Sequence, residues 1–283
     1  MMNDIAQEKV NLISAMEEQL KNELLKGEPD KLWENGFIKK QIERRKKGKE
    51  PFTLQNHIRA MVYSMLSSGN QWANVAKNVD SATGCIPDVD EIFYDYDIAK
   101  LKQSSAEQLR DDIRKIHCGT QSTFNQMKAL LSVNIDVLCS LEEKYGAVDT
   151  YYQQSIDMDN TLKTLIVLLS TTDSTIKLEQ MNIALVCEYL RNIGYDIPKP
   201  DRHICRILGS DYLALSDKKE VPPFEAFDIV VKLAELMEKP VAEVDYILWA
   251  YCAKGYGEVC TKKAPRCVKC VAGKYCKHTK KEG

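Results

Sequence analysis

The sequence predicts an all-α fold, and three observations carry that prediction. Apolar residues recur at spacings of three and four, as on one face of a helix, over residues 5–25 and again over residues 162–169. No run of four to eight residues alternates between apolar and polar side chains in the manner of a half-buried strand. No Asn-Gly or Asp-Gly pair joins two such runs into a β-hairpin.

The predicted helices have recognisable starts and breaks. Ser104 and Glu107 have the spacing of a capping box, and Pro87, Pro222 and Pro240 stand where a first helical turn can begin. Glycine, proline and small polar residues interrupt the helical pattern at 27–30, 68–70, 84–87, 119, 146, 171–174 and 194–200. The chain thus divides into an N-terminal helical extension, a helical body and a C-terminal module rich in cysteine and lysine.

Composition places the chain among ordinary globular proteins. It has 283 residues, of which 44% are hydrophobic and 28% charged, so it can form a core without disulfide bonds. The N-terminus lacks the basic and apolar regions of a signal peptide, and nowhere do 18 apolar residues run uninterrupted. We therefore expect a cytoplasmic protein whose 10 cysteines are thiols or metal-bound thiolates.

Positive charge is concentrated in two segments of a chain with 39 Lys plus Arg and 41 Asp plus Glu. Residues 37–50 contain seven Lys or Arg against two Glu, and residues 252–283 contain nine against two. Two basic segments in an otherwise acidic chain favour a polyanionic partner, most commonly nucleic acid. The alternative is a solvated helix face and a basic tail with no partner.

The C-terminal module contains four closely spaced cysteines. Cys260, Cys267, Cys270 and Cys276 form the pattern Cys-x6-Cys-x2-Cys-x5-Cys within 17 residues. Too few apolar residues surround them to form a core, so a metal centre is the natural way to hold them together. Zinc usually draws its thiolates from two Cys-x2-4-Cys pairs, whereas one tight pair with wider flanking steps suits a larger [4Fe-4S] cluster. We expect that cluster, with zinc and then disulfides as the alternatives.

This spacing resembles the [4Fe-4S] loop of the endonuclease III family of DNA glycosylases. Upstream, ILWAYCAKGYGEVC is similar to the helix that leads into that loop, and IPKPDRHICRILG (197–209) resembles the family's Asp-x-His-aliphatic segment. PFTLQNHIRAMVYSMLSS is similar to the family's first barrel helix. The resemblance covers residues 51–283 and is strongest after Gly194.

The resemblance implies two helical lobes and a glycosylase activity. Residues 51–194 are then a helical barrel lobe with a degenerate helix-hairpin-helix, and residues 195–283 form a cluster lobe on which residues 1–50 pack. The implied enzyme is a DNA N-glycosylase of base excision repair, acting on double-stranded DNA with a damaged or modified base, which it flips and hydrolyses from its sugar. We expect a monomer on the nucleoid of a prokaryote-like cytoplasm, with no membrane partner.

The aspartate of the family's matching motif is its catalytic acid–base residue, which implies that role for Asp201, in the cleft between the two lobes. Cleavage of an N-glycosidic bond builds positive charge on the deoxyribose, and a fixed carboxylate stabilises that charge and orients or deprotonates the nucleophile. The residues around Asp201 alone, after Pro200 and before a helical segment, predict only a helix N-cap. We interpret His203 as a local structural residue.

Two departures from the family pattern concern the hairpin. Bifunctional members carry a Schiff-base lysine about 18 residues before the aspartate, but the matching positions hold Ile183 or Ala184. The resemblance therefore implies a monofunctional enzyme that uses water. The usual Gly-hydrophobic-Gly turn is replaced by Gln180-Met181-Asn182, of which Gln180 and Asn182 are the expected DNA contacts. Gln is poorly suited to the left-handed conformation of such a turn.

Other DNA contacts are expected from one loop and from the cysteine module. Loop 67–72 (SSGNQW) matches the family's wedge, so Gln71 is the expected wedge and Trp72 a packing residue. Lys262, Lys263 and Lys269 are expected to face phosphates. The remaining six cysteines lack ligand spacing and are interpreted as buried thiols: Cys85, Cys118, Cys139, Cys187, Cys205 and Cys252.

Two further interpretations stay open beside the enzyme. The missing lysine and the irregular hairpin also fit a catalytically inactive iron–sulfur protein that binds unusual DNA. A zinc-stabilised helical interaction protein is the third possibility. The identity of an excised base depends on pocket contacts that one sequence does not fix.

Overall fold

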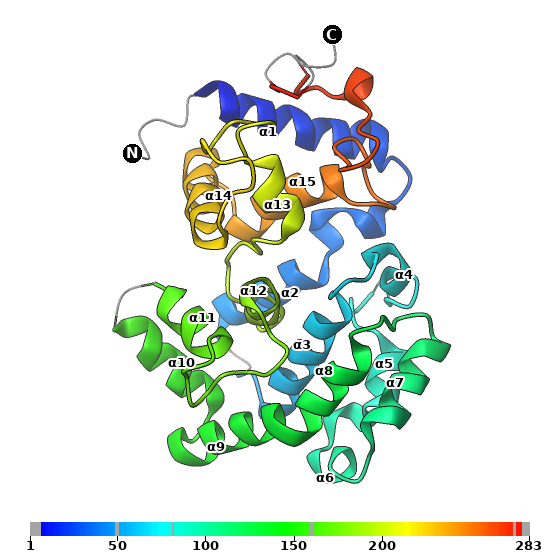
Figure 1. The fold of residues 1–283 in the computed structure, drawn as a ribbon, viewed down its shortest axis with the longest axis vertical. Helices are drawn as coiled ribbons and strands as arrows, with labels where there is room; N and C mark the ends of the chain where they lie inside the picture. The colour runs from blue at the N-terminus through cyan, green and yellow to red at the C-terminus, as the bar shows by residue number, and fades with distance from the viewer. Residues whose placement is uncertain (1–6, 49–50, 81, 159–160, 274–275, 279–283) are drawn as a thin grey trace. The chain divides into compact units, whose positions relative to one another are not determined.

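The structure is a computed structural model that describes residues 7–48, 51–80, 82–158, 161–273 and 276–278. All regular elements in these residues are helical and none is a strand, which confirms the predicted all-α class (Figure 1). No helix in this described part of the chain is long and apolar enough to cross a membrane. Contacts divide the chain into unit 1, residues 1–39 and 196–283, and unit 2, residues 40–195.

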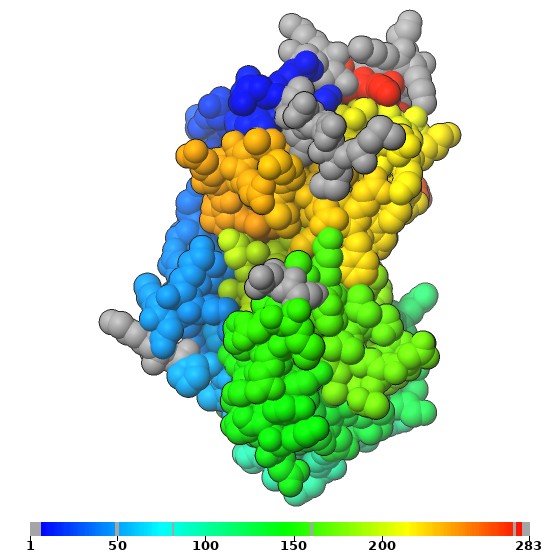
Figure 2. All heavy atoms as spheres, turned by 90° about the vertical axis from the view of Figure 1, so that its left-hand side faces the viewer, coloured from blue at the N-terminus to red at the C-terminus, as the bar shows by residue number. Residues whose placement is uncertain are grey.

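Unit 1 combines helices from both ends of the chain. Its elements are α1 (Gln7–Gln19), a π-helical turn (Leu20–Leu24), two 3-10 turns (Pro29–Lys31 and Trp33–Asn35), the start of α2 (Phe37–Lys47), α13 (Arg202–Ile207), α14 (Pro223–Met237) and α15 (Val241–Cys252). Figure 2 shows α1 and α14 side by side on one face of the unit. Just after α14, Lys239 Nζ lies 3.0 Å from Glu17 Oε1 of α1.

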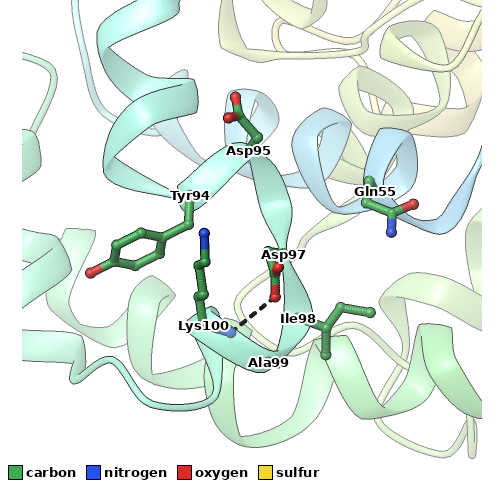
Figure 3. A pocket seen from close by; sticks show the side chains of 7 residues that line it. All are labelled: Gln55, Tyr94, Asp95, Asp97, Ile98, Ala99 and Lys100. Atoms are coloured by element: carbon green, nitrogen blue, oxygen red, sulfur yellow. Dashed lines mark hydrogen bonds between the residues drawn. The ribbon is translucent and has the colours of Figure 1, made fainter.

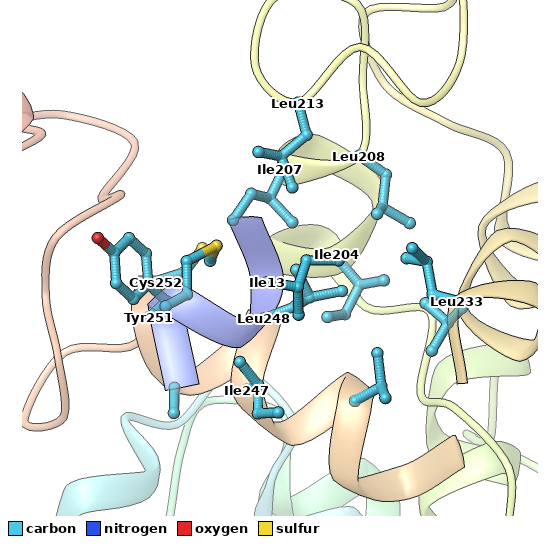
Figure 4. Packing of buried hydrophobic residues seen from close by; sticks show 14 of the residues in the cluster. Ile13, Ile204, Ile207, Leu208, Leu213, Leu233, Ile247, Leu248, Tyr251 and Cys252 are labelled. Atoms are coloured by element: carbon cyan, nitrogen blue, oxygen red, sulfur yellow. The ribbon is translucent and has the colours of Figure 1, made fainter. Parts of the chain in front are cut away.

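The core of unit 1 lies where α1, α13, α14 and α15 meet (Figure 4). Each of these helices contributes a fully buried side chain, namely Ile13, Ile204, Leu233 and Leu248. Truncation of such a side chain to alanine costs roughly 2–5 kcal/mol. Because α13 has only six residues, this packing determines its position in the unit.

Unit 2 contains ten helices after α2 in the described residues. They are α3 (Leu54–Leu66), α4 (Trp72–Ala76), α5 (Pro87–Ile92), α6 (Ile98–Leu101), α7 (Ala106–Lys115), α8 (Thr123–Ala129), α9 (Ile135–Tyr145), α10 (Val148–Asp157), α11 (Lys163–Ser170) and α12 (Ile183–Asn192). Helices α3 and α12 pack closely: Ser64 Oγ donates to Leu185 O at 2.6 Å, and Asn192 Nδ2 donates to Ala60 O at 3.0 Å. These bonds satisfy polar groups that burial would otherwise leave unpaired.

The helices begin with the types of capping residue that the sequence predicts, but not always at the predicted positions. The N-cap of α7 is Ser105, whose Oγ accepts from Gln108 N at 3.1 Å, so the prediction of a capping box at Ser104 was wrong by one residue. Of two adjacent serines, only the one with extended backbone can cap the helix. Helix α3 has a capping box that the sequence did not indicate, because Asn56 takes the place of the usual Glu or Gln opposite Thr53.

Prolines and glycines punctuate the helices largely as predicted. Pro87 is the first residue of α5, whereas Pro222 and Pro240 stand one position earlier, at the N-caps of α14 and α15. The predicted breaks fall between helices or at their ends. At one of them, Gly146 closes α9 in the left-handed conformation with φ of 80°, which a glycine adopts at no steric cost.

Candidate functional site

The four cysteines of the predicted metal motif lie in the segment that follows α15 in unit 1. Cys260, Cys267 and Cys270 are half-buried, and Cys276 is buried. The tight pair is closed by a 3-10 turn (Cys267–Lys269), in which Cys270 N donates to Cys267 O at 3.1 Å. Cys260 and Cys270 pack against the apolar core of unit 1. The core therefore anchors the segment at two of the four cysteines.

The chemistry of this donor set fits an iron–sulfur cluster. Burial raises the pKa of the Cys270 thiol, hydrogen bonds with Tyr251 and the Ala272 backbone oppose this, and the nearby Cys260 and Cys276 raise it further. Thiolates crowded in a partly buried segment require nearby positive charge, which a metal centre supplies. In the structure as described, no three His, Cys, Asp or Glu side chains are already arranged around a common metal position.

The N-terminal helix holds the cysteine segment in place, a role that the sequence did not reveal. Gln19 Nε2 donates to Lys269 O at 2.8 Å, and Gln19 Oε1 accepts from Tyr251 Oη at 2.7 Å. Tyr251 Oη accepts in turn from Val271 N at 3.2 Å. This relay joins α1, the end of α15 and the tight cysteine pair.

Arg206 connects α13 to the first cysteine. Its Nη2 donates to Cys260 O at 2.5 Å, its Nη1 lies 3.7 Å from Cys260 Sγ, and its guanidinium lies over the Tyr212 ring at 4.9 Å. A hydrogen bond from the Cys252 thiol, together with the charge of Arg206, lowers the pKa of Cys260 to about 7 against the opposing effect of burial. Metals bind the thiolate, so this environment favours metal binding at Cys260.

Asp201 is the N-cap of α13, as the residue pattern predicts. Its Oδ1 accepts from His203 N at 2.7 Å and from Ile204 N at 3.2 Å. Among the residues that the structure describes, none donates a hydrogen bond to Oδ2. Burial lowers the pKa of His203, against the attraction of Asp201, so its ring is neutral at pH 7. The two amides fix the carboxylate and leave one oxygen for another partner.

The loop before Asp201 is fastened to α15 by two other carboxylates. Asp196 Oδ1 accepts from Ala242 N at 2.9 Å, in the first turn of α15. Asp245 Oδ1 accepts from Lys199 N at 2.9 Å, and the Asp245 side chain is buried. Both ends of the loop are therefore held by unit 1, which fixes the backbone that carries Asp201.

The turn before α12 begins with a left-handed residue although it contains no glycine. Gln180 has φ of 61°, so it adopts the left-handed conformation to which Gln is poorly suited. Met181 is buried, while Gln180 and Asn182 are exposed. Asn182 is the N-cap of α12, and its Oδ1 accepts from Leu185 N at 3.0 Å. The turn therefore buries its middle residue and exposes the two flanking residues.

A buried asparagine explains how Gln180 is held in this conformation. Asn134 Nδ2 donates to Glu179 O at 3.0 Å, and Asn134 Oδ1 accepts from Glu179 N at 2.7 Å. Asn134 is fully buried at the end of a π-helical turn (Leu130–Asn134). The double hydrogen bond fixes the residue before Gln180 and offsets the cost of a left-handed non-glycine residue.

The positions at which a Schiff-base lysine would lie are confirmed to be helical and carry no amine. Ile183 and Ala184 are the first two residues of α12, and both are half-buried. The nearest preceding lysine, Lys177, is paired with Glu179 at 3.0 Å. Lys177 thus has a structural partner.

The predicted wedge loop is tied to a second loop of unit 2. Asn70 Nδ2 donates to Cys118 O at 3.0 Å, and Thr120 Oγ1 donates to Ser68 O at 3.4 Å. Gln71 is exposed at the N-cap of α4 and makes no capping bond with its side chain. Trp72 is half-buried as the first residue of α4, as predicted. The loop therefore presents Gln71 from a fixed base.

The two basic segments differ in how their charges are used. Lys262, Lys263 and Lys269 are exposed, and none of them pairs with an acidic side chain in the described residues. In α2, by contrast, Arg44 donates to Pro51 O at 2.9 Å, and Arg45 Nη2 lies 2.9 Å from Asp149 Oδ1. Arg44 and Arg45, two of the positive charges in residues 37–50, therefore make contacts that stabilise unit 2.

The other six cysteines are not all buried. Burial is confirmed for Cys118, Cys187, Cys205 and Cys252. The interpretation was wrong for Cys85 and Cys139, which are half-buried. Among the six, Cys252 is the last residue of α15 and belongs to the apolar core of unit 1.

A cavity of about 550 Å³ lies elsewhere in unit 2 and is lined by Gln55 and by residues 94, 95 and 97–100 (Figure 3). Three consecutive residues beside it, Tyr94, Asp95 and Tyr96, have φ of 52°, 49° and 64°, which is unusual for residues with a Cβ. Tyr96 Oη donates to Asp90 Oδ1 at 2.5 Å and so helps to hold this turn. None of the predicted site residues lines the cavity.

Comparisons with known proteins add no relative: a scan against protein-family models, a search of curated proteins and a search of solved structures each returned no match. A function for the chain must therefore be argued from its own residues and their contacts.

Proposed function

We propose that the chain is a monofunctional DNA N-glycosylase similar to the endonuclease III family, with a [4Fe-4S] cluster bound by Cys260, Cys267, Cys270 and Cys276. The observation that carries the proposal is the position of α13. Asp201 caps the first turn of this helix, and Arg206 in its last turn binds Cys260. A single short helix therefore links the candidate catalytic carboxylate to the cysteine motif.

Asp201 supplies the chemistry of base hydrolysis. The amides of His203 and Ile204 hold Oδ1, so Oδ2 is the oxygen offered to the substrate. As the glycosidic C–N bond breaks, its electron pair leaves with the base, and the carboxylate stabilises the positive charge on the sugar. Water then bonds to the anomeric carbon and passes a proton to the carboxylate. Since Ile183 and Ala184 carry no amine, no Schiff base forms.

The DNA contacts follow from three exposed features. The left-handed turn at Gln180 and the N-terminus of α12 present backbone amides to a phosphate. Gln71 fills the gap left by the flipped base. The exposed Lys262, Lys263 and Lys269 approach further phosphates. The cluster, when bound, supplies a rigid cross-link for the loop that carries these lysines.

Release of a base from lesion-containing duplexes tests the proposal. The protein is incubated with a panel of duplexes, and abasic sites are then cleaved with alkali. We expect Asp201→Asn to slow base release by about 100-fold or more, while Asn still caps α13 and preserves the fold. Asp217→Asn, at an exposed position of the same unit, is the matched control and should retain the wild-type rate. Equal rates for wild type and Asp201→Asn would refute the catalytic role.

A second candidate function is a cluster-bearing protein that binds unusual DNA without cutting a glycosidic bond. The side chains of Gln180 and Asn182, in place of glycines, favour it because they change the surface that meets a phosphate. Release of no base from any duplex, together with binding to bent or unpaired DNA, would support this alternative. Metal analysis of anaerobic protein separates iron from zinc and so tests the cofactor independently of activity.

A further inference from the structure

Tyr212 lies outside the metal motif, in the loop between α13 and α14, and its backbone is firmly held there. Tyr212 N donates to Gly209 O at 3.0 Å, and Leu213 N donates to Ile207 O at 3.1 Å. Leu213 is buried beside Ile207 in the core of unit 1 (Figure 4). A Cβ at Gly209 would lie 2.1 Å from Lys219 O, so the loop closes on itself where only glycine fits. The half-buried Tyr212 ring is therefore presented from a fixed base.

One contact of this ring leads to the first cysteine of the motif. The Arg206 guanidinium lies over the Tyr212 ring, 4.9 Å from its centroid. Arg206 Nη2 also donates to Cys260 O at 2.5 Å. The ring thus helps to hold the arginine that binds the backbone of Cys260.

Two further contacts of Tyr212 lead to the last cysteine of the motif. Lys277 N donates to Tyr212 O at 3.3 Å. The His278 ring stacks on the Tyr212 ring, with centroids 5.4 Å apart and an angle of 22° between the ring planes. Both residues directly follow Cys276, whose side chain is buried. A single tyrosine therefore contacts the partner of Cys260 and the residues after Cys276.

We propose that Tyr212 is a positioning residue of the metal centre, which holds the chain beside Cys260 and beside Cys276 and so keeps the first and last ligands in place. Residues that support metal ligands without touching the metal commonly contribute 10- to 100-fold to metal affinity. The contacts also reduce the entropy that the chain loses when a metal closes the loop between the two cysteines. This inference rests on the proposed metal centre and not on the glycosylase reaction.

The test measures how fast the full-length protein, purified anaerobically, releases its metal to an excess of EDTA. Tyr212→Ala removes both ring contacts and should release the metal about tenfold faster than the wild type. Tyr212→Phe keeps the ring and should release it at the wild-type rate. Tyr246→Ala is the matched control, because it removes a half-buried tyrosine of α15 whose ring lies 6.0 Å from that of Trp33. It should retain the wild-type rate.

Metal content and helical circular dichroism are measured for each variant before EDTA is added. Equal rates for wild type and Tyr212→Ala overturn the proposal, as does a Tyr212→Phe rate equal to that of Tyr212→Ala. Equally fast release from Tyr246→Ala would show a general loss of stability and would also overturn it. A wild type without metal overturns it as well.

A second variant carries the test if Tyr212→Ala fails to fold. His278→Ala removes only the stacked ring and should speed metal release by about threefold, and an unchanged rate overturns the proposal. Base release is assayed on the same preparations. Metal release that depends on Tyr212, with no base released from any duplex, would support the inference and count against the glycosylase.

Discussion

The polar contacts inside unit 1 differ in kind from those inside unit 2. Unit 2 contains a hydrogen-bonded group of fully buried side chains, in which Tyr189 Oη lies 2.6 Å from His57 Nδ1 and 2.9 Å from Tyr152 Oη. Unit 1 contains instead a cysteine segment that is anchored by Arg206 at Cys260 and by Gln19 at Lys269. In the first group the hydroxyl of Tyr189 has two partners from the same unit, whereas the second segment contains the four cysteines for which we propose a metal.

The border of the unit 2 network contains oppositely charged side chains. Asp149 Oδ1 lies 3.4 Å from His57 Nε2 and 2.9 Å from Arg45 Nη2, and Arg45 Nε donates to Ile193 O at 2.6 Å. Each charge has an opposite charge or a dipole beside it, as burial requires. From this comparison we expect unit 2 to be stable alone and the stability of unit 1 to depend on the proposed metal.

If the proposed metal is bound, its removal is expected to have the largest effect and to act on unit 1 alone. Chelation, or Cys270→Ser, leaves several partly buried thiols without a common positive partner and should destabilise unit 1 by more than about 4 kcal/mol. Hydrogen exchange followed by mass spectrometry reports each unit separately. Amides of α13 and α15 should lose protection, while those of α3 and α12 should keep it.

Cys139→Ser, at a half-buried cysteine of α9, is the matched control for that experiment. It should leave protection in unit 1 unchanged. Equal protection of α13 with and without the metal would show that packing alone stabilises unit 1, and the proposed contrast between the units would then be lost.

The next largest effect is expected from Tyr189→Phe in unit 2. This substitution removes one hydroxyl and leaves both His57 Nδ1 and Tyr152 Oη, two buried polar atoms, without that partner. Unpaired buried groups cost about 1–3 kcal/mol each. The free energy of unfolding of unit 2, measured in urea, should therefore fall by about 3 kcal/mol. Tyr151→Phe, on the half-buried neighbour in α10, should change stability by less than about 0.5 kcal/mol.

A smaller effect is expected from acid, again in unit 2. Burial lowers the pKa of His57 below 6.5, although Asp149 opposes the shift. Between the lowered value and 6.5 the unfolded chain binds a proton that the folded chain does not, so stability is full above pH 6.5 and falls as the pH is lowered through this range. The pKa of Asp149 is lowered from 3.8, so its own contribution is lost only at more acidic pH.

Hydrogen exchange of α3 and α12 between pH 7.5 and pH 5, corrected for the intrinsic exchange rate, measures this dependence. The variant His57→Gln should flatten it, at a cost in stability that does not vary with pH. If α3 keeps the same opening free energy across the range in the wild type, His57 does not couple folding to pH.

Local patterns predicted the helices and the cap at Asp201, because both depend on residues within one or two turns. The segment around Pro200 and Asp201 already contains the extended residue and the helix that a cap needs. Even locally, the choice between Ser104 and Ser105 failed, since both have the residue type of a cap. The residue type determines which side chains are able to cap a helix, and the backbone conformation determines which of them does so.

Contacts between distant residues were not predictable. Asn134 and Glu179 are 45 positions apart, and Gln19 and Lys269 are 250 positions apart. No short pattern marks Asn134 as the residue that holds Gln180 in a left-handed conformation, so the sequence indicated only that Gln was unsuitable there. The cysteine spacing predicts a metal site because metal ligands often lie close together in sequence, and that prediction stays open; residues that support such a site, such as Gln19 and Arg206, need not lie near it in sequence.

The smallest effect is expected at Gln180, where the hairpin turn of unit 2 departs from glycine. Gln180→Gly removes the strain of a left-handed residue with a Cβ, which stabilises the folded chain by about 1 kcal/mol. Glycine also gives the unfolded chain more conformational freedom, which offsets part of this gain. We therefore expect the free energy of unfolding to rise by about 0.5 kcal/mol. Gln154→Gly, at an exposed position inside α10, should instead destabilise by about 1 kcal/mol. Opposite signs in urea unfolding would confirm that Gln180 is strained and that Asn134 holds it there. If both variants are destabilised, the Gln180 side chain stabilises the turn by contacts of its own, and a glycine there would not strengthen the proposed grip on DNA.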